Sequence, residues 1–168
     1  WDYWCVLGPD LAVSVTYADI DYLGIAGIWI HEFSSGFDVE VSKISPFARG
    51  LSLPEEACTG AMHANIGGLD LRLTELPDRT EIVGTCDRTP HGPLAVDLEI
   101  KRPEGHDTLN VVIPWSDKRF QFTSKHNGRP ASGTVRVGDR QFDLAEEDPT
   151  FGIFDLGRGI WPYSNRWN

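Results

Sequence analysis

The sequence is poor in cysteine and has no long uninterrupted run of apolar residues. Its three cysteines are odd in number and widely spaced, and no Cys-x-x-Cys pair occurs. A disulfide scaffold or a zinc knuckle is therefore not expected, and reduced thiols favour the cytoplasm. No apolar stretch approaches the roughly 18–20 residues that a membrane-spanning helix needs. The first residues also lack the basic and apolar regions of a signal peptide.

The short motifs of common enzyme classes are missing as well. The chain contains no GxSxG elbow, no GxxxxGK[ST] phosphate loop and no HExxH pair. The five histidines are scattered, so their spacing predicts neither a metal site nor a cofactor. The net charge of −10 argues against nucleic acid as a partner, because like charges repel a phosphate backbone.

What the sequence does contain is apolar and polar residues in alternation, which is typical of half-buried strands. The clearest predicted strands cover residues 11–17, 25–31, 38–44, 69–74, 81–86 and 94–100. No window shows convincing helical spacing. Asn127-Gly128 between two alternating stretches predicts a hairpin, because this dipeptide suits a type I′ turn. Residues 137–142 predict a further reversal.

Short strands divided by Gly, Pro and Asp indicate one antiparallel sandwich or up-and-down barrel spanning residues 1–168. Many aromatic residues lie near the two ends, namely Trp1, Tyr3, Trp4, Phe151, Phe154, Trp161, Tyr163 and Trp167. Such rings are costly to leave in water. Either the first and last strands pair to close a barrel, or both ends pack on further chain. Because the chain starts without Met in a strand-like run, we expect it to be cut from a longer protein.

The segment 114–125 provides the first candidate site. Alternation places Arg119, Gln121 and Lys125 on one face and Phe120 on the other, with Trp115 just before them. One interpretation is a solvent face above a core face. The other is a barrel whose polar lumen orients a ligand.

The segment 151–163 provides the second. Asp155 and Arg158 stand among glycines and rings, together with Trp161 and Tyr163. If these two charged residues are buried, each needs a partner. A structural tether and a ligand contact both fit this pattern.

Two carboxylates between two tyrosines form a third candidate, in the segment Tyr17-Ala18-Asp19-Ile20-Asp21-Tyr22. Paired carboxylates can perform acid–base chemistry when their environments separate their pKa values. A solvated turn before Gly24 is the alternative.

Longer motifs carry a family resemblance. Trp1-Asp2-Tyr3-Trp4, the segment 109–130 and the segment 155–163 together resemble domain-of-unknown-function family 2804 over nearly the whole chain. This resemblance implies a lipocalin-like, calycin-type barrel or strongly curved sheet, with few or no helices. It also implies a distant similarity to carotenoid hydratases and tocopherol cyclases, and a second such barrel after Asn168. No catalytic residue can be transferred from these relatives.

Two functions follow as hypotheses. The first is binding of an apolar small molecule, lipid- or isoprenoid-like, in the barrel, with any catalysis free of cofactors. Its ligand-binding candidates are Trp115, Arg119, Gln121, Lys125, Asp155, Arg158, Trp161 and Tyr163. The rival is a structural half-domain that packs its aromatic residues against a sister β-domain and has no pocket of its own. The sequence assigns no reaction.

Overall fold

The computed structural model describes residues 1–145 and 147–164. These residues form thirteen strands and no helix. Trp167, counted above among the aromatic residues near the ends, lies outside the described residues. No helix long and apolar enough to cross a membrane is found in the described chain.

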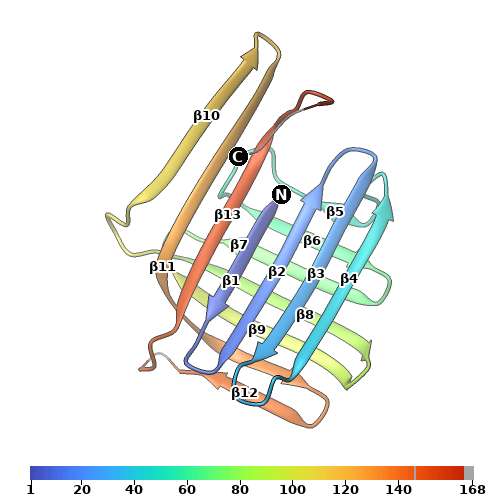
Figure 1. Cartoon of the computed structure of the whole chain (residues 1–168), viewed down its shortest axis with the longest axis vertical. Coiled ribbons are helices and arrows are strands. Elements are labelled where there is room, and N and C mark those ends of the chain that lie inside the picture. The colour runs from blue at the N-terminus through green and yellow to red at the C-terminus, as the bar shows by residue number, and fades with distance from the viewer. Residues whose placement is uncertain (146, 165–168) are drawn as a thin grey trace.

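The strands form two layers that face each other, and every pairing is antiparallel (Figure 1). The front layer contains β1 (Asp2–Leu7), β2 (Leu11–Asp19), β3 (Leu23–Glu32), β4 (Asp38–Pro46), β10 (Thr108–Ser116) and β13 (Phe151–Ile160). The back layer contains β5 (Leu51–Ser52), β6 (Ala61–Ile66), β7 (Leu69–Glu75), β8 (Arg79–Thr89), β9 (Gly92–Lys101) and β12 (Arg140–Leu144). The long strand β11 (Arg119–Val137) belongs to both.

Both layers are parts of one strongly curved sheet with the order β4-β3-β2-β1-β13-β11-β9-β8-β7-β6-β5. The first strand pairs with the last, since Asp2 lies opposite Leu156 and Leu7 opposite Phe151. Among the described strands no pairing joins β4 to β5, so the sheet curls without closing there. The predicted all-β, strongly curved sheet is confirmed, and it is consistent with a lipocalin-like fold.

Strand β11 turns from the front layer to the back layer at the Asn-Gly dipeptide. It pairs with β13 up to His126 and again from Arg129, with a register shift between them, and Gly128 has a φ of 74°. The prediction of a hairpin at Asn127-Gly128 is therefore wrong. The same dipeptide serves a β-bulge, which also needs a residue with positive φ. The predicted reversal near residue 138 is confirmed, because Val137 pairs with Arg140.

The interior is filled by the inward residues of both layers. Alternation buries Leu69, Leu71 and Leu73 of β7 completely, and Trp4 of β1 faces them from the front layer in the same apolar cluster. The layers approach closely at Gly84, where a Cβ atom would lie 2.7 Å from Cδ1 of Ile28. The described core is thus packed side chain against side chain between the two layers.

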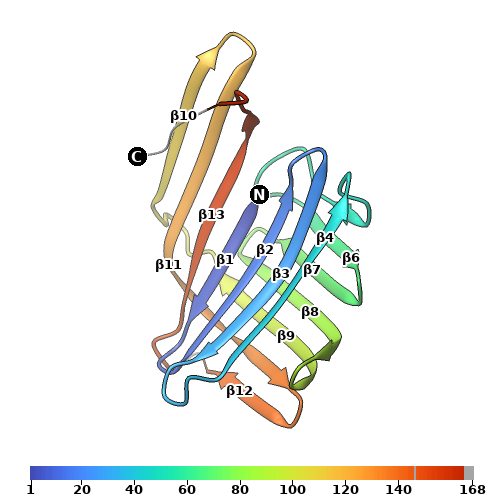
Figure 2. The ribbon, with the colours of Figure 1, turned by 45° about the vertical axis from the view of Figure 1, so that its right-hand side comes forward.

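One hairpin extends past the two-layered body. Strand β10 and the first part of β11 rise beyond the strands of the back layer in both views (Figures 1 and 2). The hairpin turns at Asp117-Lys118, since Ser116 pairs with Arg119. Every residue of β10 is exposed. No described strand of the back layer covers the inward face of this part of the sheet.

Candidate functional site

Charged side chains gather at one end of the space between the two layers. We call this group the polar cluster, and it comprises Asp2, Glu75, Arg102, His126, Arg129 and Arg158. These residues come from strands β1, β7, β11 and β13 and from the segment that follows β9. Antiparallel pairing brings the start of β1 beside the end of β13, and the ends of β7 and β9 to the same edge of the back layer.

Arg129 is the innermost member of the polar cluster. It is 0% exposed, and its guanidinium lies over the ring of Trp4, 5.0 Å from the ring centroid. Its Nε donates to the carbonyl oxygen of Lys101 at 2.7 Å, and its Nη2 donates to that of Ile100 at 3.0 Å. Burial lowers the pKa of Arg129 to about 10, so the side chain stays charged at neutral pH. These described partners are uncharged oxygens.

Glu75 and Arg102 form an ion pair beside Arg129. Arg102 Nη2 donates to Oε2 of Glu75, and Thr80 Oγ1 donates to the same oxygen at 2.9 Å. The Glu75 side chain is only 2% exposed. Burial raises the pKa of Glu75, whereas the hydrogen bond from Thr80 and the charges of Arg102 and Arg129 act in the opposite direction. Desolvation therefore dominates in spite of the nearby arginines.

His126 is buried next to these arginines. Its Nε2 lies 3.1 Å from Ser124 Oγ, and its ring meets Phe154 edge-on, with the centroids 5.2 Å apart. Burial, followed by the charges of Arg129 and Arg102, lowers the pKa of His126 to about 4. The imidazole is therefore neutral at physiological pH.

Arg158 and Asp2 form a second ion pair at the edge of the polar cluster. Arg158 Nη1 donates to Oδ1 of Asp2 and, at 3.0 Å, to the carbonyl oxygen of Trp1. Asp2 is buried, while about a fifth of the Arg158 side chain is exposed (21%). Arg158 continues the inward series Phe154 and Leu156 along β13, so it faces the core side of the sheet.

Unmatched hydrogen-bonding atoms concentrate in this region. Within the described chain, buried atoms without a partner include Trp4 Nε1, Glu75 Oε1, Arg102 Nε, His126 Nδ1, Arg129 Nη1 and Arg158 Nη2. Buried polar atoms are usually paired in folded proteins, and an unpaired one costs about 1–3 kcal/mol. Six such atoms therefore lie in or next to the polar cluster.

An apolar surface leads away from the polar cluster along the protruding hairpin. We call it the apolar wall, and it consists of Val112, Phe120, Phe122 and Ile160. They share one face, because Val112 pairs with Phe122, Phe120 with Ile160, and Phe122 with Arg158. Val112 is 62% exposed, Ile160 59% and Phe120 39%. The wall thus joins the buried charges at Arg158.

The polar cluster opens to solvent beside the end of β9. A cleft of about 570 Å³ there is lined in part by Arg102, His106, Thr108 and His126. Arg102 and His126 belong both to this cleft and to the polar cluster. The cleft therefore gives solvent access to these two members of the polar cluster.

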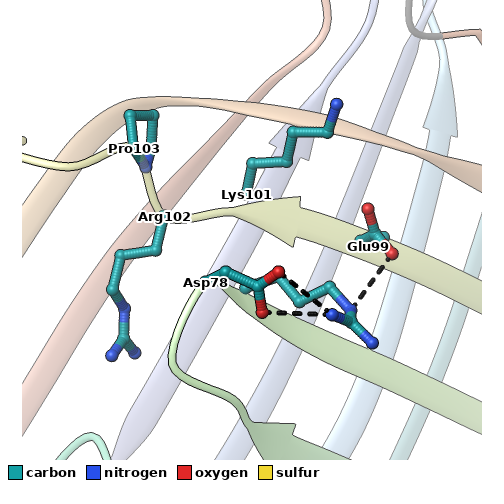
Figure 3. A pocket seen from close by; sticks show the side chains of 6 residues that line it. Asp78, Glu99, Lys101, Arg102 and Pro103 are labelled. Carbon is teal, nitrogen blue, oxygen red and sulfur yellow. Dashed lines mark hydrogen bonds and ion pairs between the residues drawn. The ribbon is translucent and has the colours of Figure 1, made fainter.

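A neighbouring depression of about 360 Å³ has a different character (Figure 3). There Arg79 pairs with Asp78 at 3.0 Å and with Glu99 at 3.3 Å. Lys101 and Arg102 point to opposite sides of the chain (Figure 3). The guanidinium of Arg79 forms ion pairs with surface carboxylates. Arg102 instead forms its ion pair with Glu75, in the polar cluster.

The eight residues predicted as ligand contacts all lie on or just after β10, β11 and β13, but they do not form one site. Arg158 is the one among them that belongs to the polar cluster. Lys125 and Asp155 form an ion pair of 2.8 Å, and register places both, with Gln121, on the outward face. Gln121 is nevertheless buried, and Tyr163 is fully exposed. Each predicted charge does have a partner, as the sequence required.

The remaining predicted residues take part in an aromatic group on the outward side. Trp161 meets Trp1 at 5.2 Å and Trp115 at 6.1 Å between ring centroids, both edge-on. Arg119 Nη1 donates to the carbonyl oxygen of Trp161 at 2.5 Å. A Cβ atom on Gly157 would lie 2.5 Å from the ring of Trp1, so only glycine allows this indole to lie on the strand.

The two carboxylates at Asp19 and Asp21 belong to the turn between β2 and β3. Oδ1 of Asp19 accepts a hydrogen bond from the backbone nitrogen of Asp21 at 2.9 Å, and Asp21 has a φ of 67°. Both residues are exposed. This geometry is that of a solvated turn, not of a buried acid–base pair.

Sequence reasoning missed most of the polar cluster, although a signal for it was present. Glu75 follows the inward series Leu69, Leu71 and Leu73 at the same spacing of two, and Arg102 follows Leu98 and Ile100 in the same way. A charge that continues an inward series of apolar residues must be buried or must end the strand. Here Glu75 is buried at the end of β7, and Arg102, whose side chain is partly exposed, follows the end of β9.

A strongly curved antiparallel sheet with buried charges at one end defines an all-β domain with an amphipathic interior face. The chain belongs to the family described as Domain of unknown function (DUF2804), whose model matches residues 1–168. No curated protein and no solved structure matches it significantly. In the described chain, no group of three or more His, Cys, Asp or Glu side chains is placed to hold a metal ion.

Proposed function

We propose that this domain binds an apolar small molecule, lipid- or isoprenoid-like, against the apolar wall, with its polar end at the polar cluster. The single observation that carries this proposal is the continuity of the two surfaces. Phe122 of the wall is register partner to Arg158 of the cluster. Ligand sites are typically apolar with a few convergent polar groups.

Exposure of the wall supports the same proposal. Val112, Phe120 and Ile160 leave a contiguous apolar face in water, and such faces mark binding sites more often than chance. The resemblance to calycin-type barrels, which include carotenoid hydratases and tocopherol cyclases, supports an apolar ligand class. Because the core is filled with side chains, we propose that the ligand lies at the open end of the curved sheet, under the hairpin, and not in a central lumen.

Titration with dodecan-1-ol, followed by tryptophan fluorescence and native mass spectrometry, tests the proposal. We expect a one-to-one complex in the wild-type chain. Val112→Lys should weaken it at least about tenfold, because a charge would be placed on the wall. Val83→Lys is the matched control, since Val83 is 46% exposed on the outward face of β8. Equal affinity in both variants would show that the ligand does not bind at the apolar wall. Absence of any complex would contradict the proposal as a whole.

A second candidate function is that of a structural half that docks onto a sister β-domain. The observation favouring it is β10 itself. Among the described strands it pairs with β11 alone, all nine of its residues are exposed, and none of them is charged. Edge strands of that kind are normally protected by charges or covered.

Amide hydrogen exchange separates the two candidates. If β10 docks onto a second domain, its amides exchange rapidly in the chain of 168 residues and slowly when the second domain is present. Rapid exchange in both samples would exclude docking at this edge, and protection on addition of dodecan-1-ol alone would favour the ligand site.

A further inference from the structure

The unmatched atoms in and next to the polar cluster are mostly donors. Trp4 Nε1, Arg102 Nε, Arg129 Nη1 and Arg158 Nη2 can only donate hydrogen bonds. Against them stands Glu75 Oε1 as an acceptor, while Nδ1 of His126 can take either role. The described side chains therefore cannot satisfy one another, and a ligand that paired with these atoms would have to supply mainly acceptors.

The charges of the cluster lead to the same class of partner. Asp2 is paired with Arg158, and Glu75 is paired with Arg102. The described hydrogen-bond partners of Arg129 are then uncharged oxygens, namely the carbonyl oxygens of Lys101 and Ile100 and the hydroxyl of Thr80. One buried positive charge is in excess, in a protein whose net charge is −10. An isolated buried charge is costly unless a counter-charge joins it.

We infer that the ligand is an amphipathic monoanion, an apolar chain ending in a carboxylate, whose head group is held by Arg129 with help from Arg102. This inference rests on the proposed function and deepens it. A carboxylate has two acceptor oxygens and a single charge, which matches one excess guanidinium and its unfilled donors. The apolar chain then lies against Val112 and Phe120 of the wall.

The experiment compares dodecanoate, dodecan-1-ol and dodecyl phosphate by isothermal titration into the full chain. These probes share one apolar chain and differ in the head group. The wild type should bind dodecanoate about tenfold or more tightly than the alcohol, because charge-assisted hydrogen bonds are the stronger ones. Arg129→Gln should reduce this ratio to near one.

Arg102→Gln is the second variant, in case the loss of Arg129 prevents folding. It removes one positive charge at the cleft and should also abolish the preference for dodecanoate. Arg136→Gln is the matched control, since Arg136 lies on the same strand β11 but is exposed. This control should keep the preference of the wild type.

The possible outcomes separate the two proposals. Equal affinity for dodecanoate and the alcohol overturns the carboxylate assignment but leaves the apolar site intact. A preference that survives in both Arg129→Gln and Arg102→Gln also overturns the assignment, as does tighter binding of dodecyl phosphate. No binding of any probe overturns the proposed function and this inference with it.

Discussion

The burial of His126 between an aromatic ring and two arginines couples the stability of the fold to pH. The folded imidazole has a pKa of about 4, whereas its ordinary value is 6.5. Between these pH values His126 binds a proton in the unfolded chain but not in the folded chain. The contribution of His126 to the free energy of unfolding is therefore fully present above pH 6.5. It is lost as the pH falls toward 4, by up to about 3 kcal/mol.

His126→Gln should remove this part of the acid sensitivity. Glu75, whose pKa is raised, has the opposite sign, because its contribution declines as the pH rises. The difference between wild type and variant isolates His126, since Glu75 is present in both. Urea unfolding at several pH values from 4 to 7 measures it, with His91→Gln, at an exposed position, as the control. Parallel pH profiles for wild type and His126→Gln would contradict the assignment.

The two ion pairs of β13 lie on opposite faces of the sheet, so they should differ in energetic importance. Asp2→Asn leaves Arg158 without its buried partner and should cost about 3 kcal/mol, as breaking buried pairs generally does. Asp155→Asn breaks the half-exposed pair with Lys125 and should cost less than about 1 kcal/mol. Chemical denaturation measures both. Similar costs would show that burial does not distinguish the pairs.

At the scale of single elements, the sequence predicts strands well because alternation is a local property. The runs at residues 69–74 and 94–100 fall within β7 and β9 as expected. It fails at Asn127-Gly128 because a hairpin turn and a β-bulge make the same local demand, a residue with positive φ. Only the non-local pairing of β11 with both β13 and β9 decides between them.

The bulge at Gly128 gives a prediction of its own. A Cβ atom there would meet nothing within 4 Å, and φ is +74°, so any cost of substitution comes from the backbone. Gly128→Val should destabilise the fold by about 2 kcal/mol, and Gly128→Asn by clearly less, because Asn tolerates this conformation. Thermal unfolding compares the two variants. Equal losses would mean that the bend does not depend on positive φ.

For the whole molecule, the candidate site follows from the curvature that brings strand ends together. Arg158 is visible in the sequence as a charge among rings. Its companions Glu75, at the end of β7, and Arg102, just after β9, are far away in the chain, and their convergence depends on how the sheet bends. Alternation indicates which residues face inward but not which inward residues meet. The inward orientation of single site residues can therefore be predicted from the sequence. Their convergence into one cluster cannot.

The shared core makes the two layers one cooperative unit. Phe154 stacks on Trp4 at 4.3 Å, and both belong to a core that contains residues of both layers. Phe154→Ala should cost about 3–5 kcal/mol, while Phe151→Ala, at a position on the same strand that is 44% exposed, should cost about 1 kcal/mol or less. Because one core joins front and back, fluorescence and circular dichroism should report a single coincident transition in urea for each variant. Separate transitions would show that the front layer, with its wall and charges, can open while the back layer stays folded, and the site would then be an independently mobile part of the molecule.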